Sequence, residues 1–335
     1  MILGKAVELP FFNAEAQRGR RTADNGFPFL CGPLASPLRL CVEKGFFRMS
    51  RIALLVVLLA LLQGCASRGF PAVTESGVDP QAEALLLRSA ERHGLAAWQK
   101  VQDVSVAYSG EWGWLVPRLQ PELIDAGYRQ KSEERLILGK DWLLGQQHQG
   151  PQGSKQVVRA AESVSVAYNG EPSADRTAAA AAALVADGYR LFLSGPFYFL
   201  GGNAVLALAG SETVDGRLCD RIVAVRRPGL GLSAEDRFML WLDRTDGRLR
   251  RVRFTLEGLA STQGAVAEVD FVGHRQIDGV LWPVRFIERL KKPIPDLHVH
   301  DWQLVGLDLN RGLSPSEIGA TGFSGKAVAP AQPLP

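Results

Sequence analysis

The chain has 335 residues and a formal net charge of +3, from 38 Lys and Arg against 35 Asp and Glu. Residues 1–65 contain eight of the basic and four of the acidic residues, so the remaining 270 residues carry a net charge of −1. This balance excludes a nucleic-acid-binding role, because binding to phosphates requires clustered basic residues. The length after residue 65 is sufficient for one large domain or two small ones.

An export signal is indicated by residues 49–65. Arg51 precedes eleven consecutive apolar residues, 52–62, which end shortly before Cys65. A helix of this length spans about 16 Å, which is too short for a hydrocarbon core of about 30 Å. A basic start, a short apolar stretch and a small residue at the cleavage position are typical of a cleaved signal peptide, here residues 49–64. An ordinary membrane anchor and a chance apolar run are the alternatives.

Residues 62–65, Leu-Gln-Gly-Cys, resemble the lipobox of bacterial lipoprotein signals. The resemblance implies that Cys65 becomes the first residue after cleavage and carries the lipid that anchors the protein to a membrane. Ala66 and Ser67 lack the aspartate that favours inner-membrane retention in Gram-negative bacteria, so the resemblance implies the outer membrane, facing the periplasm. Because a signal belongs at an N-terminus, we expect residues 1–48 to be an incorrectly assigned start or a disordered leader.

The segment after the lipobox, residues 65–78, is rich in Gly, Ser, Thr and Pro, and we expect it to be a flexible tether.

Lipidation of Cys65 leaves Cys219 as the only cysteine of the exported part. We therefore expect neither an intramolecular disulfide nor a cysteine metal cluster, and no cofactor. Residues 319–335 lack any periodicity and are expected to form a disordered tail.

Two helical regions are expected in the part between tether and tail. Asp79 followed by Pro80 is a typical helix start, and Gly94 is a suitable residue to end that helix. A second helix is expected within residues 173–200, built on a run of six alanines and ended by Gly188.

The rest of residues 101–309 is predicted to be mostly antiparallel sheet. An eight-residue phrase that begins at Val104 returns at Val164 with seven identical residues, and we interpret both copies as strands that end in a turn. Asp-Gly pairs between apolar runs are the strongest short-range signal of a hairpin. They occur at 215–216, 246–247 and 278–279.

Residues 79–318 resemble the superfamily of the lipoprotein-localisation factors LolA and LolB. The resemblance rests on the opening helix, the helical insertion, and the phrases Leu-Trp-Leu-Asp at 240–243, Ile-Asp-Gly-Val-Leu-Trp-Pro at 277–283 and Asn-Arg-Gly-Leu-Ser-Pro at 310–315. It implies a mainly β, α+β domain: a half-open antiparallel β-barrel with helices covering its concave face. LolB is itself an outer-membrane lipoprotein, which agrees with an anchor at Cys65.

Sequence signatures of common catalytic sites are absent. The chain has no Gly-x-Ser-x-Gly, His-Glu-x-x-His or P-loop motif, so we expect a protein that is not an enzyme. A metal-dependent hydrolase is one alternative, because His298 and His300 would lie on the same face of a strand. Residues 301–303, however, do not extend this pair into a metallo-hydrolase motif.

Aromatic side chains are the better candidates for a binding site. Such residues could line a cavity for acyl chains, with the segment 189–200 as a lid, or could form a closed core. The expected function is that of a membrane-anchored lipoprotein that binds a lipid, an acylated peptide or another apolar ligand. An envelope scaffold that binds a protein partner is the alternative. The candidate ligand-binding residues are Phe192, Phe197, Phe199, Trp241 and Phe254.

Overall fold

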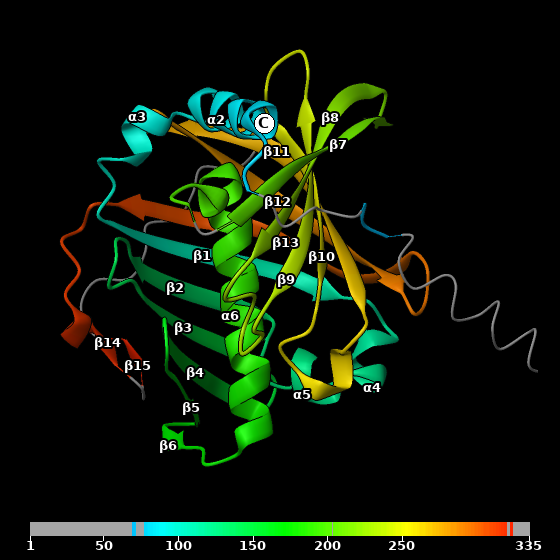
Figure 1. Cartoon of the computed structure of the whole chain (residues 1–335). Helices are drawn as coiled ribbons and strands as arrows, with labels where there is room; N and C mark the ends of the chain where they lie inside the picture. The colour runs from blue at the N-terminus through cyan, green and yellow to red at the C-terminus, as the bar shows by residue number, and fades with distance from the viewer. Residues whose placement is uncertain (1–68, 72–76, 203, 320–321, 324–335) are drawn as a thin grey trace, which may run out of the picture. The chain divides into compact units, whose positions relative to one another are not determined.

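The computed structural model describes four parts of the chain, all within the unit Leu61–Pro335: residues 69–71, 77–202, 204–319 and 322–323 (Figure 1). The expected leader, the expected signal peptide and Cys65 lie outside the described residues, as does most of the expected tail. Within the described ranges, no helix combines the length and the apolar character that crossing a membrane requires.

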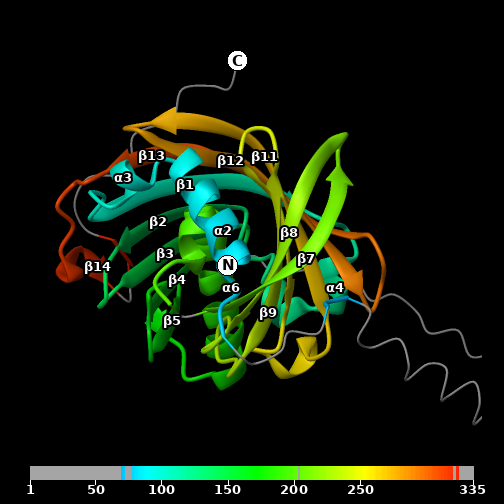
Figure 2. The ribbon, with the colours of Figure 1, turned by 45° about the horizontal axis from the view of Figure 1, so that its top comes forward.

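A curved sheet of thirteen antiparallel strands is the frame of the molecule (Figures 1 and 2). The strands are β1 (Asp103–Trp112), β2 (Lys131–Ile137), β3 (Leu143–Gly150), β4 (Gly153–Ala160), β5 (Val164–Tyr168), β6 (Glu171–Pro172), β7 (Ala204–Val214), β8 (Arg217–Arg226), β9 (Asp236–Asp243), β10 (Leu249–Thr255), β11 (Val266–Ile277), β12 (Val280–Lys292) and β13 (Leu297–Leu309). A separate two-stranded sheet contains β14 (Ile318–Gly319) and β15 (Gly322–Phe323).

The order of the strands makes the sheet an open half-barrel. Neighbouring strands are also consecutive in the chain, except that β1 pairs with β13 and so joins the two halves of the sheet. Among the described strands, β6 and β7 form the two edges and do not pair with each other. The predicted fold class, a half-open antiparallel barrel with helices, is therefore confirmed.

The longer helices lie on the concave face of the sheet (Figures 1 and 2). The start of the first one is as predicted: the side chain of Asp79 accepts hydrogen bonds from the backbone N–H groups of Gln81 and Ala82. Gly94, with a φ of 89°, follows its end. The helices are α2 (Pro80–Arg92), α3 (Leu95–Trp98), α4 (Val116–Leu119), α5 (Pro121–Ile124) and α6 (Arg176–Ser194), with 3-10 helices η1 (Gly195–Phe199), η2 (Ala260–Thr262) and η3 (Pro315–Glu317).

Helix α6 continues past the residue at which we expected it to end. Asp175 caps its start, and Gly188 lies in its interior with helical backbone geometry. The prediction at Gly188 was wrong because the apolar residues that follow, such as Leu191 and Phe192, are buried against the sheet in helical conformation. Burial of this face outweighs the unfavourable helix propensity of one glycine, about 1 kcal/mol.

Turn chemistry accounts for several hairpins. Asp215 and Asp278 have φ values of 48° and 49°, and each is followed by a glycine with positive φ, the geometry of a tight hairpin turn.

The repeated eight-residue phrase has a different conformation in each of its two copies. The copy from Val164 ends in a turn at Asn169, as expected, but the copy from Val104 stays within β1. It remains extended because Gly110 is paired with β13.

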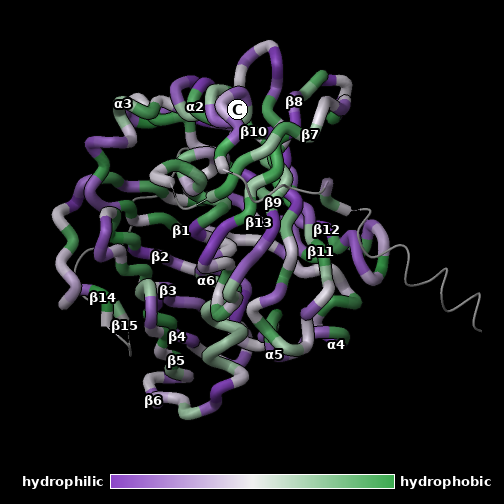
Figure 3. The backbone as a smooth tube through the Cα atoms, viewed as in Figure 1, coloured by the Kyte–Doolittle hydropathy of each residue, from purple (hydrophilic) through white to green (hydrophobic). Residues whose placement is uncertain are grey.

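The two faces of the sheet differ in chemistry. On β9, Phe238 and Leu240 belong to the main core between sheet and helices, whereas Trp241 belongs to a second buried cluster on the outer face. Elsewhere the outer face carries ion pairs, such as Arg253 with Glu268 at 2.6 Å. Figure 3 shows apolar and polar residues interleaved along the sheet. The helices α2 and α6 pack against the apolar side chains of the concave face.

Candidate ligand-binding site

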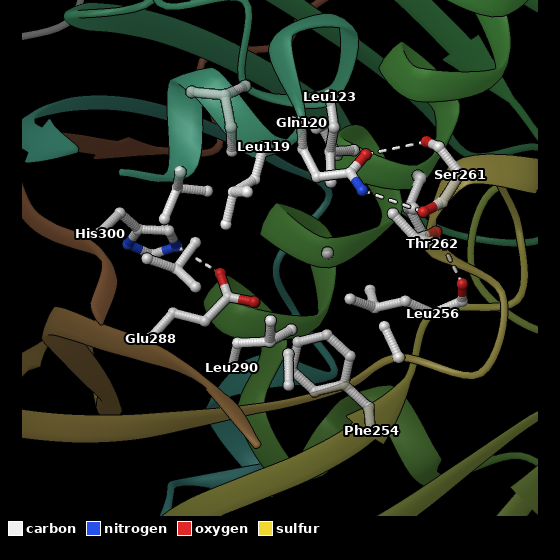
Figure 4. Close-up of a pocket in the computed structure, with 18 of the residues that line it drawn as sticks. Leu119, Gln120, Leu123, Phe254, Leu256, Ser261, Thr262, Glu288, Leu290 and His300 are labelled. Atoms are coloured by element: carbon white, nitrogen blue, oxygen red, sulfur yellow. Dashed lines mark hydrogen bonds and ion pairs between the residues drawn. The ribbon is translucent and has the colours of Figure 1, made fainter. Parts of the chain in front are cut away.

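A cavity of about 220 Å³ lies between the concave face of the sheet and a group of short helices (Figure 4). Its walls come from α6 and from strands β10 to β13, and its roof comes from α4, α5 and the segment around η2. Most of the lining is apolar, as expected of a site for an apolar ligand. The apolar lining includes Leu119, Leu123, Phe254, Leu256, Leu290 and Val299.

Prolines determine the shape of the roof. Pro121 lacks a backbone N–H and restricts Gln120 before it, so α4 ends and α5 begins at this point. Gln120 is thereby presented to the segment around η2, where its Nε2 donates to the carbonyl of Ser261 at 2.9 Å. The hydroxyl of Ser261 donates in return to Oε1 of Gln120 at 2.8 Å (Figure 4). These two exposed hydrogen bonds join the two parts of the roof.

Arg129 supports the roof from below and also lines the cavity. Its side chain is buried, and Nη1 donates to the carbonyls of Leu123 at 2.9 Å and Ile124 at 3.1 Å. These carbonyls belong to the C-terminal end of α5 and have no partner within the helix. The guanidinium also lies 4.7 Å from the ring centre of Trp112. The Gln120–Ser261 contact thus holds the roof on its exposed side, and Arg129 holds it on the side that faces the cavity.

A polar pair interrupts the apolar wall. Nε2 of His300 lies 2.7 Å from a carboxylate oxygen of Glu288, and both residues line the cavity (Figure 4). The register of β12 and β13 places these two residues opposite each other. His300 is buried, and its Nδ1 has no hydrogen-bond partner among the described residues.

The two histidines of the alternative hydrolase site do not lie together. The register between β12 and β13 shifts, so that Val299 is an extra residue between the pairs that His298 and His300 make. This bulge turns His300 inwards and leaves His298 exposed on the outer face. The expectation that both side chains share a face was therefore wrong. The described part of the chain also holds no group of three or more His, Cys, Asp or Glu positioned to bind a metal.

Buried polar groups also occupy the concave face of β2 and β3. Nε2 of Gln146 donates to Glu134 at 2.8 Å, and both side chains are fully buried. Burial raises the pKa of Glu134 to about 8, because the ionised carboxylate loses its hydration. Burial likewise lowers the pKa of His148 well below its usual value. His148 is therefore uncharged at neutral pH, and Glu134 is protonated in most molecules.

The structure brings two of the five candidate aromatic residues to the cavity, namely Phe192 and Phe254. Phe197 stacks on Trp98 at 4.5 Å, and Phe199 packs edge-on against Phe238 at 5.2 Å, both within the core. Trp241 lies in the cluster on the outer face, away from the cavity. The segment 189–200, expected as a lid, is the end of α6 followed by η1.

Sequence reasoning singled out His300 as a metal ligand, but it identified neither the roof nor the other polar groups of the cavity. Pro117 and Pro121, four residues apart after a strand, were the available signal for two short helices. Glu288 and the Gln120–Ser261 contact left no local signal, because each depends on residues that are distant in the chain. Arg129 bonds to carbonyls five and six residues away, but no sequence motif marks it.

The fold and the cavity define an open antiparallel half-barrel with an apolar pocket under a helical roof. No protein-family model and no curated protein matches the chain. Among solved structures, the chain is similar to a LolA superfamily protein from Nitrosomonas europaea, with a TM-score of 0.44 and 14% identity over 74% of this chain and 98% of that one. It is also similar to a DUF1329 family protein from Desulfovibrio piger, with a TM-score of 0.41 and 12% identity over 74% of this chain and 100% of that one.

Proposed function

We propose that this protein binds the acyl chain of a lipid or of an acylated peptide, or another apolar chain of similar width, in the cavity beneath α4 and α5. One observation carries the proposal. Leu123 in the roof, Phe192 in α6 and Phe254 in the sheet come from separate parts of the chain and surround about 220 Å³. In a closed core such side chains would be in contact, because protein interiors are densely packed.

The size of the cavity indicates how much of a ligand it would hold. Pockets that enclose a whole drug-sized ligand measure about 300–1,000 Å³, so a cavity of about 220 Å³ would hold one part of a long chain. Each buried methylene group contributes about 0.8 kcal/mol, so eight groups contribute about 6 kcal/mol before the entropy cost of ordering the chain. Binding of this kind requires no catalytic group, and we propose a carrier or receptor that is not an enzyme.

The proposed location is the cell envelope, with the domain anchored through lipidated Cys65 to the outer membrane and facing the periplasm. The lipobox-like residues 62–65 support this proposal. Replacing Cys65 with Ser removes the thiol that would carry the lipid, and should move the protein from the membrane fraction to the soluble fraction. A Cys65→Ser protein that stays in the membrane fraction would contradict lipid anchoring.

Native mass spectrometry of the gently purified full chain tests the binding function. The expected result is an additional mass on the folded protein that is lost on denaturation, with acyl-containing lipid recovered by solvent extraction. A protein that carries no such mass and also takes up no added fatty acid would contradict the proposal. That result would favour an envelope scaffold that binds a protein partner.

A further inference from the structure

Arg129 differs from the other fully buried arginines of the described structure. Arg135 and Arg159 are each paired with a carboxylate, Glu133 at 3.2 Å and Asp187 at 3.0 Å. Among the described residues, no carboxylate lies within ion-pair distance of Arg129, although its side chain is only 2% exposed. A buried charge without a counter-ion is costly unless something else compensates it.

The contacts that Arg129 does make compensate its charge only in part. Two backbone carbonyls accept hydrogen bonds from its Nη1, and the rings of Trp112 and Tyr189 lie at 4.7 and 5.8 Å from its guanidinium carbon. Its Nε is buried and has no hydrogen-bond partner among the described residues. Carbonyl dipoles and aromatic rings attract a cation but carry no net negative charge.

The neighbouring acids do not supply that charge either. The carboxyl of Glu134, on β2, is not within ion-pair distance of Arg129; burial raises its pKa to about 8 although the charge of Arg129 lowers it, and it accepts a hydrogen bond from Gln146. Glu288, which also lines the cavity, has its carboxylate 2.7 Å from Nε2 of His300 and not within ion-pair distance of Arg129. Arg129 therefore lines the cavity without an ion-pair partner among the described residues.

We propose that the ligand is an anionic amphiphile, whose carboxylate or phosphate pairs with Arg129 while its apolar chain occupies the cavity. This inference rests on the proposed function and adds the class of the head group. A guanidinium presents several N–H donors in a planar fork that matches both anions, and charge-assisted hydrogen bonds of this kind are about twice as strong as neutral ones. Because the site is buried, salt would screen the pair only weakly.

Chain-matched probes test the head group by calorimetry on the full chain. Decanoate, decan-1-ol and decyltrimethylammonium share an apolar chain and differ in the charge of the head. We expect decanoate to bind at least about tenfold more tightly than decan-1-ol, which corresponds to about 1.4 kcal/mol. Decyltrimethylammonium should bind most weakly. Equal binding of all three would overturn this inference and leave the proposed function intact, whereas no binding of any probe would overturn the proposed function itself.

Two variants connect the preference to Arg129. In Arg129→Gln, which retains a donor for the roof carbonyls, the preference for decanoate over decan-1-ol should fall below about threefold while decan-1-ol still binds. Arg129→Lys keeps the charge but loses the planar fork, so its preference should lie between those of the wild-type chain and Arg129→Gln. A full preference in folded Arg129→Gln would contradict the role of Arg129. If that variant does not fold, the comparison of the three probes on the wild-type chain still decides the charge of the head group.

Discussion

Gln120 and Ser261 hydrogen-bond to each other in both directions, although 141 residues separate them in the chain. The amide of Gln120 donates to the backbone at Ser261, and the hydroxyl of Ser261 donates to the amide oxygen. The pair joins the α4–α5 junction to the segment around η2 at the exposed side of the cavity (Figure 4). We expect this pair to hinder a ligand that enters from that side.

Removing this contact should speed ligand exchange more than it weakens the fold. Gln120→Ala deletes two hydrogen bonds that are both exposed, so water can replace them, and each contributes no more than the low end of about 0.5–1.5 kcal/mol. We expect a several-fold faster release of a fluorescent fatty acid in stopped-flow measurements, and a decrease of about 1 kcal/mol or less in the free energy of unfolding. The double variant Gln120→Ala with Ser261→Ala should release the probe no faster than Gln120→Ala alone, since Gln120→Ala already removes both hydrogen bonds. Additive effects would contradict the mutual contact.

Gly188 allows the cavity to be filled from α6. It lines the cavity, and a Cβ added to it would meet no atom within 4 Å. Gly188→Ala should raise the free energy of unfolding by about 0.5–1 kcal/mol, because glycine is unfavourable inside a helix. Gly188→Leu should occupy space that the ligand needs, and weaken decanoate binding on the order of tenfold or more.

Each of the two substitutions at Gly188 serves as the experimental control for the other. Thermal unfolding should show that both variants are folded, and calorimetry should show that decanoate binding is lost mainly in Gly188→Leu. If the leucine variant binds decanoate as well as the alanine variant does, the chain does not occupy the space beside Gly188.

Asp187 anchors α6 to the sheet and to a loop of the cavity wall. Its Oδ2 accepts from Nη2 of Arg159 at 3.0 Å and from the backbone N–H of Gly231 at 2.8 Å, and all three groups are buried. Asp187→Ala would leave the Arg159 charge buried without its partner. We expect a loss of about 3–5 kcal/mol in chemical denaturation.

An exposed ion pair provides the control for this prediction. Arg244 is 48% exposed and pairs with Asp220 at 2.7 Å. Arg244→Ala should cost less than about 1 kcal/mol, because water solvates both charges once they separate. Similar losses for Asp187→Ala and Arg244→Ala would contradict the anchoring role of Asp187.

Glu134 should make stability depend on pH. Burial raises its pKa from 4.5 to about 8, so between these pH values the folded protein binds a proton that the unfolded chain releases. The free energy of unfolding should therefore fall as pH rises through this window, by up to about 1.4 kcal/mol per pH unit from this group. Glu134→Gln should remove that part of the dependence and be the more stable form at pH 8. Parallel curves for the two proteins in denaturant titrations from pH 5 to 8 would contradict the shifted pKa.

Features set by neighbouring residues could be predicted from the sequence. The cap at Asp79 and the turns at Asp215 and Asp278 depend on local backbone chemistry, and the structure has them as expected. The end of α6 was missed because it depends on tertiary burial. Gly188 alone favours a helix end, but the apolar residues that follow it pack on the sheet only if the helix continues.

The candidate site was harder to predict because the residues that build it are distant in the chain. Glu288 and His300 meet through strand register, and one bulge at Val299 decides which histidine faces the cavity. Phe192 and Trp241 are both buried aromatic residues, yet they lie on opposite faces of the sheet. Composition and periodicity identify such residues as buried but do not show which of them border a cavity.

Cross-linking with a photoactivatable fatty acid tests the central claim most directly, because it reports where an acyl chain lies. We expect cross-links in peptides that contain Val116–Leu119, Pro121–Ile124 and Val299. Excess decanoate and the Gly188→Leu substitution should both suppress them. Cross-links confined to the outer face around Trp241, or unchanged in Gly188→Leu, would contradict binding in this cavity.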